Sequence, residues 1–237
     1  MTEAWRLLVV GASGAIGGAV VARGRARGWD VVGTSRRSAS DAGSDGDRLL
    51  RFDPLLDPAD VFAGQPPFDA VCWAHGVNLN DSLLDFDVAQ HLELYRSNCL
   101  SVLVSLAALI AAGRLSPKGA RLAVISSIWE QRARRNKLSY TVTKAAIGGL
   151  VRSAAVDLGA AGHLINGVLP GVLQTPMTES NLSSDQIARV CGMVSAGRLP
   201  DLAAVADTVL FLCSSENTSI SGQSITVDLG MNNACLV

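Results

Sequence analysis

Short, continuously apolar runs alternate along this chain with segments of helical periodicity, and this alternation restricts the fold more than any other feature. The apolar runs are rich in Val, Ile and Leu and cover residues 6–10, 30–34, 49–52, 69–74, 121–126, 164–169 and 224–229. Strands that are apolar at every position are covered on both faces. Helical spacing marks the intervening segments 15–27, 87–112, 140–161 and 201–213. The pattern predicts right-handed βαβ units, and therefore a single α/β domain over residues 1–237 with a doubly wound parallel sheet of about seven strands and helices on both faces.

Composition excludes several classes of partner. Hydrophobic residues make up 49% of the 237 positions and the formal net charge is -1, which argues against a protein that coats nucleic acid or an anionic membrane. The five cysteines are scattered without a CxxC pair, which is typical of reduced, buried thiols and predicts no metal site. The apolar run 99–112 is shorter than the roughly 18 residues of a membrane-spanning helix. We expect a cytoplasmic protein with no membrane or nucleic-acid partner.

A glycine-rich segment follows the first predicted strand. The sequence VVGASGAIGGAV places Gly11, Gly14 and Gly17 between that strand and the first helix. Glycines allow a tight turn and a close approach of a pyrophosphate to the helix N-terminus, where free N–H groups favour negative charge. No Lys-Ser/Thr pair follows the glycines, which disfavours a phosphate-transfer loop. The segment predicts a dinucleotide site, and the alternative is a glycine-rich turn that binds nothing.

The end of the second strand indicates which dinucleotide is bound. NAD sites commonly place an acidic residue here, hydrogen-bonded to the ribose hydroxyls, but this chain has Ser35, Arg36 and Arg37. Guanidinium groups pair with a 2′-phosphate in a forked geometry. The alternative is a solvated arginine pair at a strand end. We predict a preference for NADP(H), with NAD(H) not excluded.

The segment SYTVTKAAIGGL places Tyr140 and Lys144 one helical turn apart on a common face. A free tyrosine has a pKa of about 10, and a nearby ammonium lowers it. Ser127 ends a predicted strand, where open α/β sheets build their sites, and Asn98 lies at the start of the apolar helix. A hydroxyl, a phenol, an ammonium and an amide together can polarise a carbonyl and donate a proton as a hydride arrives.

These residues, in this order and spacing, resemble the short-chain dehydrogenase/reductase family, and 3-oxoacyl-carrier-protein reductases in particular. The resemblance also covers the segments LPGVLQTPM (169–177) and GQSITVDLG (222–230). It implies a Rossmann-type fold with Tyr140 as the general acid/base and Lys144 as the tyrosine activator and ribose ligand. Ser127 would orient the carbonyl, and Asn98 would hold a water molecule in a proton relay. The cofactor ligands expected from the glycine segment and the resemblance are Gly11, Ser13, Ala15, Ile16, Gly17, Ser35, Arg36, Arg37, Asp53, Ala74, Gly76, Tyr140, Lys144, Pro170, Gly171, Val172 and Thr175.

The chain departs from the family pattern at three places. Ala15 stands where the family usually has a glycine, and WAHG (73–76) replaces the usual NNAG. The segment between Asp53 and Val71 is short, so we expect one crossover helix to be reduced to a turn. His75 is interpreted as a hydrogen-bonded packing residue, with a proton-relay role as the alternative.

Two segments are expected to surround the substrate. Between Ser127 and Tyr140 runs WEQRARRNK, in which the cations could steer an anionic substrate such as an acyl group on a phosphopantetheine carrier. The alternative is a solvated loop whose charge is balanced by Glu130. Residues 177–200 are expected to form a lid, either an apolar cover over the substrate or an amphipathic helix packed on the core.

The sequence therefore predicts an NADPH-dependent enzyme that reduces a ketone to a secondary alcohol, with a 3-oxoacyl thioester or polyketide-like carbonyl as one form of the substrate. An alcohol dehydrogenase working in the oxidative direction and a non-catalytic dinucleotide sensor are the alternatives. The resemblance also suggests a homotetramer or homodimer, in which the apolar segments 99–112 and 140–161 would pair across a symmetric interface.

Overall fold

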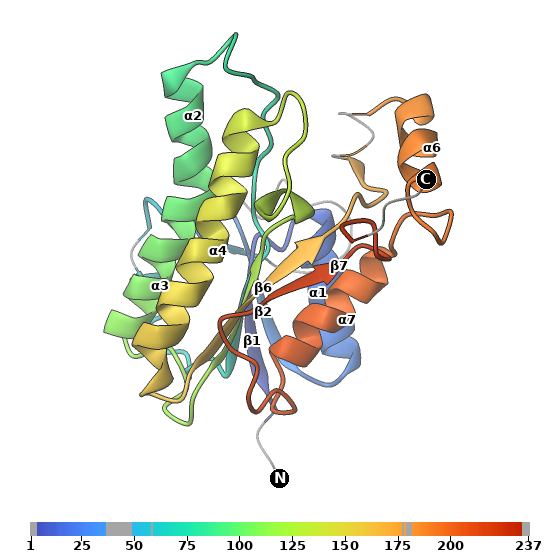
Figure 1. The fold of residues 1–237 in the computed structure, drawn as a ribbon. Helices are drawn as coiled ribbons and strands as arrows, with labels where there is room; N and C mark the ends of the chain where they lie inside the picture. The colour runs from blue at the N-terminus through green and yellow to red at the C-terminus, as the bar shows by residue number, and fades with distance from the viewer. Residues whose placement is uncertain (1–3, 37–48, 58, 177, 179–181, 234–237) are drawn as a thin grey trace.

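A single parallel sheet organises the chain (Figure 1). The computed structural model describes residues 4–36, 49–57, 59–176, 178 and 182–233. Seven strands lie in the order β3-β2-β1-β4-β5-β6-β7, and every pairing is parallel. The strands are β1 (Arg6–Val10), β2 (Asp30–Ser35), β3 (Leu50–Arg51), β4 (Ala70–Trp73), β5 (Arg121–Ile125), β6 (Leu164–Pro170) and β7 (Ser224–Val227). This confirms the predicted doubly wound sheet.

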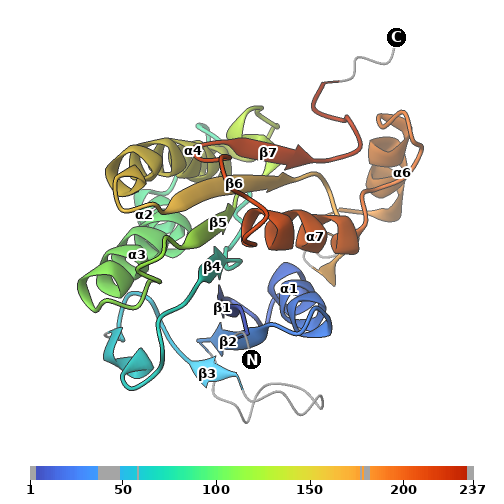
Figure 2. The same cartoon turned by 90° about the horizontal axis from the view of Figure 1, so that it is seen from below.

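Helices cover both faces of the sheet (Figure 2). One face packs against α2 (Val88–Tyr95), α3 (Ser101–Ala111) and α4 (Leu138–Gly159), and the other against α1 (Ala15–Ala26) and α7 (Leu202–Leu212). The β4 and β5 side chains are buried on both faces, which explains why these strands are apolar at successive positions. Each face therefore has its own apolar core.

A π-helical turn joins α2 to α3. Asp87 caps α2 by accepting a hydrogen bond from the Gln90 N–H at 3.0 Å, and the π turn covers Arg96–Leu100. Residues 88–111 thus form one continuous apolar helix with a mean hydropathy of 1.6, long enough to span a membrane. Half of it is buried inside the protein, with Val102 and Leu109 in the core. Packing on the sheet therefore accounts for the apolar side chains of its buried half.

The connection between β3 and β4 contains only a short 3-10 helix, η2 (Ala59–Phe62). The sequence predicted this reduction of a crossover helix to a turn, and the structure confirms it. Phe62 and Phe68 are fully buried and pack edge to face at 5.5 Å between ring centroids. Aromatic packing thus closes this end of the sheet without a full helix.

Candidate active site

One cavity of about 950 Å³ joins the glycine segment to Tyr140 and Lys144. It is lined by residues that follow β1, β2, β4, β5 and β6, at the carboxyl ends of the strands, where doubly wound sheets bind ligands. The predicted site residues that line it are Gly11, Ser13, Ala15, Ile16, Ser35, Arg36, Asp53, Ala74, Gly76, Ser127, Tyr140, Lys144, Pro170, Gly171, Val172 and Thr175. Gly17 and Asn98 do not line the cavity, and Arg37 lies outside the described residues.

The glycine segment forms a cradle that side chains would fill. Gly11 has φ +88°, and a Cβ atom there would lie 2.7 Å from the His75 backbone nitrogen. A Cβ atom on Gly17 would lie 2.2 Å from the Gly11 carbonyl oxygen, so this glycine brings α1 close to the turn instead of contacting the cavity. The N-cap of α1, Gly14, has no side chain to occupy the free N–H groups of the first turn. The cradle therefore fits the pyrophosphate of a dinucleotide.

Two charged side chains lie at the far end of the cradle. Ser35 is buried and its hydroxyl donates to Ser13 Oγ at 3.1 Å, while Arg36 is exposed and lines the cavity. Asp53 lines the cavity after β3 and accepts a hydrogen bond from the Leu55 N–H at 3.0 Å. The described residues at the end of β2 are thus a hydroxyl and a guanidinium, with no carboxylate among them.

Ser127, Tyr140 and Lys144 meet at the other end of the cavity. Ser127 follows β5, and its side chain lies near enough to the Tyr140 phenol to lower the pKa of that phenol. Lys144 Nζ donates to the Ile125 carbonyl at 3.1 Å and lies 5.5 Å from the centroid of the Tyr140 ring. The carboxyl end of β5 and the first two turns of α4 therefore place a hydroxyl, a phenol and an ammonium together.

Burial controls the acidity of this group. Desolvation raises the pKa of Tyr140 to about 12, and the nearby Ser127 side chain opposes the rise. Burial also lowers the pKa of Lys144 to about 8. The prediction that the ammonium lowers the tyrosine pKa is wrong for this structure, because the desolvation of the phenol dominates. Tyr140 is therefore protonated at neutral pH.

Asn98 lies behind this group, in the π turn between α2 and α3. Its Oδ1 accepts from the Val77 N–H at 2.8 Å, and its Nδ2 donates to the Val77 carbonyl at 3.0 Å and to Thr143 Oγ1 at 3.1 Å. With 2% exposure, the amide ties the loop after β4 to α4. The predicted water-holding role stays a prediction.

In WAHG, Trp73 and Ala74 stand where the family usually has two amides, and His75 follows them. Trp73 is fully buried and donates from Nε1 to Ser105 Oγ at 2.7 Å, so it belongs to the core beneath α3. His75 lines the cavity, and its Nε2 lies 2.6 Å from Ser101 Oγ. Burial, followed by the charge of Lys144, lowers the pKa of His75 to about 4, so the ring is neutral. This agrees with the interpretation of His75 as a hydrogen-bonded packing residue.

Sequence reasoning missed several residues near Tyr140. Val77, Asn78 and Trp129 line the cavity, and Lys137 lines it with 3% exposure. Val77 and Asn78 could have been predicted, because they belong to the loop at the carboxyl end of β4. The burial of Lys137 could not, since it ends a run of charged residues that has the composition of a solvated loop.

The predicted lid is partly described. Thr178 and Leu182 line the cavity, and α6 (Ser184–Gly192) follows with a capping box between Ser183 and Gln186. No residue of α6 is fully buried; just beyond it, Val194 packs against Ile128. Met177, which the predicted cover included, lies outside the described residues. The described part of the lid before α6 therefore lines the cavity, and the part after α6 packs on the core.

Comparison with known proteins identifies the family. Residues 62–232 match the family model described as enoyl-(acyl carrier protein) reductase. The chain belongs to the short-chain dehydrogenase/reductase family. As a member of this family it is an oxidoreductase whose cofactor is a nicotinamide dinucleotide.

Relatives within the family match nearly the whole chain. The 3-oxoacyl-[acyl-carrier-protein] reductase FabG of Escherichia coli is 29% identical over 94% of this chain and 96% of its own length. The L-xylulose reductase of Mus musculus is 30% identical over 95% of each chain. A solved structure described as a putative betaketoacyl-ACP reductase is 29% identical, with a TM-score of 0.81, and covers 99% of this chain and 100% of its own.

Proposed function

We propose that this short-chain dehydrogenase/reductase uses NADPH to reduce a ketone to a secondary alcohol. The observation behind the proposal is that one cavity contains both the glycine cradle and the group of Ser127, Tyr140 and Lys144. A cofactor held in the cradle and extended along the carboxyl ends of β1, β4 and β6 would reach this group. The residues present therefore fit both the binding and the chemistry.

Each residue of the group has one task in the reaction. The Ser127 hydroxyl lies near the Tyr140 phenol in the same cavity, so a carbonyl oxygen that accepts hydrogen bonds from both hydroxyls would be fixed and polarised. A reduced nicotinamide, when bound in this cavity, would supply the hydride for the carbonyl carbon. Tyr140 gives its phenolic proton to the oxygen, and the Lys144 ammonium at 5.5 Å from the ring stabilises the phenolate that forms. A proton from solvent then restores the phenol.

The acidity of Tyr140 favours the reductive direction. A pKa of about 12 leaves the phenol protonated at neutral pH, which is the state that proton donation requires. Oxidation of an alcohol would require the phenolate as a base, and burial opposes that state. A non-catalytic dinucleotide sensor has less support, because such a protein has no need for a buried lysine beside a tyrosine in the cavity.

NADPH is proposed over NADH because of the charge at the end of β2. Arg36 lines the cavity there, and a guanidinium can pair with a 2′-phosphate in two parallel hydrogen bonds. A carboxylate at this position would repel the phosphate and favour NADH instead.

The class of ketone is a separate question. The names of the Escherichia coli relative and of the similar solved structure refer to 3-oxoacyl thioesters on a carrier protein, and the name of the mouse relative refers to a sugar ketone. Beyond a ketone in general, a 3-oxoacyl thioester is the more specific candidate substrate. The cation-rich loop between β5 and α4 is the feature that favours it.

Loss of nicotinamide absorbance tests the proposed activity. Purified protein is mixed with NADPH or NADH and with methyl levulinate, levulinate, acetoacetate or the N-acetylcysteamine thioester of acetoacetate. The proposal predicts turnover of at least one ketone, faster with NADPH than with NADH. NADPH that binds without any turnover across the panel would favour a sensor and contradict the proposal.

A further inference from the structure

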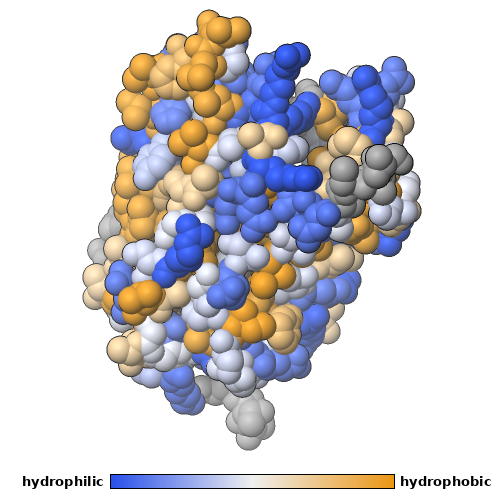
Figure 3. All heavy atoms as spheres, viewed as in Figure 1, coloured by the Kyte–Doolittle hydropathy of each residue, from blue (hydrophilic) through white to orange (hydrophobic). Residues whose placement is uncertain are grey.

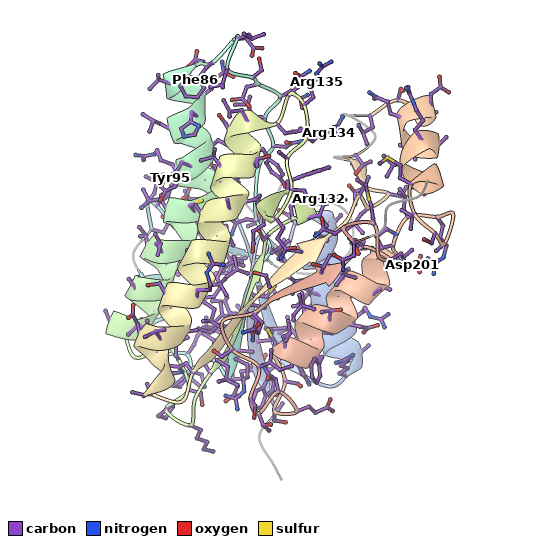
Figure 4. All side chains as sticks on the ribbon, viewed as in Figure 1. Phe86, Tyr95, Arg132, Arg134, Arg135 and Asp201 are labelled. Atoms are coloured by element: carbon purple, nitrogen blue, oxygen red, sulfur yellow. The ribbon has the colours of Figure 1, made fainter. Side chains whose placement is uncertain are left out.

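The cations between β5 and α4 have different environments in the structure (Figure 4). Arg132 donates from Nη1 to the Met231 carbonyl at 3.0 Å and so anchors the loop after β7. Arg135 is exposed and does not line the cavity. Arg134 and Lys137 both line the cavity that also contains Tyr140. Figure 3 shows strongly hydrophilic residues between the α4 side of the molecule and α6.

Lys137 is the most enclosed of these cations, with 3% exposure at the start of α4. Its Nζ donates to Asn78 Oδ1 at 2.6 Å and to the Leu79 carbonyl at 3.3 Å. The same atom lies 5.7 Å from the centroid of the Tyr140 ring. An ammonium has three N–H donors, and both recorded acceptors are neutral. The charge of Lys137 is therefore next to the reacting phenol and is not neutralised by its hydrogen bonds.

No acidic partner in the described part of the chain neutralises this pair. Neither Arg134 nor Lys137 forms an ion pair with a described residue. Asp81 partly offsets the charge of Lys137 and raises its pKa, but it forms no ion pair with this ammonium, and its oxygens accept hydrogen bonds from the Ser139 N–H and hydroxyl. Burial, and then the charge of Arg134, lower the pKa of Lys137 to about 8, so the ammonium persists at neutral pH. A buried cation beside a second cation costs free energy unless an anion accompanies it.

We propose that Arg134 and Lys137 bind the carboxylate of an oxo-acid substrate, next to the carbonyl that Ser127 and Tyr140 hold. This inference rests on the proposed ketone reductase function and narrows its substrate to ketones that carry a carboxylate within a few carbons of the carbonyl. Lys137 Nζ lies 5.7 Å from the centroid of the Tyr140 ring, so an anion bound to this ammonium would fit on the reacting molecule itself. The phosphate of a carrier arm would lie at the far end of a long chain, outside this part of the cavity.

Binding measurements test the anion site without turnover. Levulinate and methyl levulinate have the same ketone and differ in the carboxylate charge. The dissociation constant of each is measured by calorimetry on the wild-type protein. We expect levulinate to bind at least about tenfold more tightly than its ester, because a charge-assisted hydrogen bond is worth about 1.5–3 kcal/mol. In Lys137→Gln and in Arg134→Gln the ratio should fall towards one, while Lys137→Arg should retain most of it.

Arg135→Gln is the matched control, because it removes one positive charge from the same loop outside the cavity. It should leave the ratio unchanged; a loss equal to that in Lys137→Gln would indicate a general effect of net charge and overturn the site. Arg134 is partly exposed, so Arg134→Gln keeps the test available if the change at Lys137 prevents folding.

Turnover separates this inference from the proposed function. Tighter binding of levulinate with no NADPH oxidation on any ketone would support the anion site and contradict the reductase. Turnover with equal binding of levulinate and its ester would support the reductase and overturn the anion site. A neutral acetoacetyl thioester that outperforms acetoacetate in kcat/KM would likewise overturn it, in favour of a carrier-bound substrate.

Discussion

Two lysine ammonium groups lie near the Tyr140 ring, 5.7 Å from its centroid for Lys137 and 5.5 Å for Lys144, and burial lowers the pKa of each to about 8. The spacing of Tyr140 and Lys144 in the sequence was enough to place them on one face of a helix. It could not give the sign of the tyrosine pKa shift, since that depends on how much water the folded chain removes from the phenol. The burial of Lys137 near Tyr140 could not be predicted, because the charged residues before it are typical of an exposed loop.

The lysine pKa predicts the pH dependence of reduction. Below about pH 8 Lys144 is charged and stabilises the phenolate that forms at Tyr140, and above it that charge is lost. Tyr140, with a pKa of about 12, stays protonated throughout this range. We therefore expect kcat/KM for reduction of methyl levulinate to fall as pH rises through about 8. The neutral ester excludes an effect of carboxylate binding at Lys137, whose own ammonium also loses its proton at about pH 8 and would add to the same fall. A profile that rises through the same range would contradict this role of Lys144.

Arg36 should control the choice of cofactor. Its removal in Arg36→Ala takes away the proposed partner of the 2′-phosphate, so we expect KM for NADPH to rise at least about tenfold. KM for NADH, which has no such phosphate, should change little. Arg51→Ala is the control, because this arginine on β3 is exposed and outside the cavity. Equal increases for both cofactors in Arg36→Ala would refute the assignment.

At the scale of elements, the strands and main helices were predicted almost to the residue, because continuous apolar runs and helical periodicity have few other solutions. The π turn at Asn98 was not foreseen. Its residues have ordinary helical composition, and the extra residue in the turn allows the Asn98 amide to meet both polar groups of Val77. Contacts between distant segments of this kind leave no local signal.

The packing of α1 on the glycine turn gives a prediction for Gly17. A Cβ atom there would lie 2.2 Å from the Gly11 carbonyl oxygen and 2.9 Å from Ala12 Cα, so Gly17→Ala must displace α1. We expect a loss of about 1–3 kcal/mol in the free energy of unfolding and weaker NADPH binding. Gly149→Ala, in α4 with nothing within 4 Å of the new Cβ, should instead stabilise the protein by about 1 kcal/mol. Thermal unfolding and NADPH titration measure both, and an unchanged cofactor affinity in Gly17→Ala would argue against the cradle.

At the scale of the whole molecule, the face formed by α2, α3 and α4 exposes many apolar side chains. Leu103 is 43% exposed and Val156 81% exposed, and Figure 3 shows further hydrophobic residues over α2. Tyr95 is the last residue of α2 and Phe86 lies just before this helix, and both side chains are exposed (Figure 4). We propose that this face pairs two copies of the chain in a homodimer or homotetramer, as a large exposed apolar patch on a folded protein marks an interaction surface.

Light scattering after size-exclusion chromatography tests the interface. The wild-type mass should be that of two or four chains, and the double change Leu103→Glu with Val156→Glu should reduce it, because buried carboxylates on both copies would repel. Phe211→Glu is the control, since this residue is 39% exposed on α7, on the opposite face of the sheet. A monomeric wild type would contradict the proposal. The cytoplasmic location stays a prediction.

The role of Tyr140 as proton donor is the central claim, and Tyr140→Phe tests it most directly. The change removes one hydroxyl and keeps the ring that lies near the ammonium groups of Lys137 and Lys144. NADPH affinity and kcat are measured on the same preparation with a ketone that the wild type reduces. We predict that NADPH still binds with an affinity within a few fold of wild type, while kcat falls by about 10²–10⁴. A variant that binds NADPH and keeps the wild-type kcat would contradict the account.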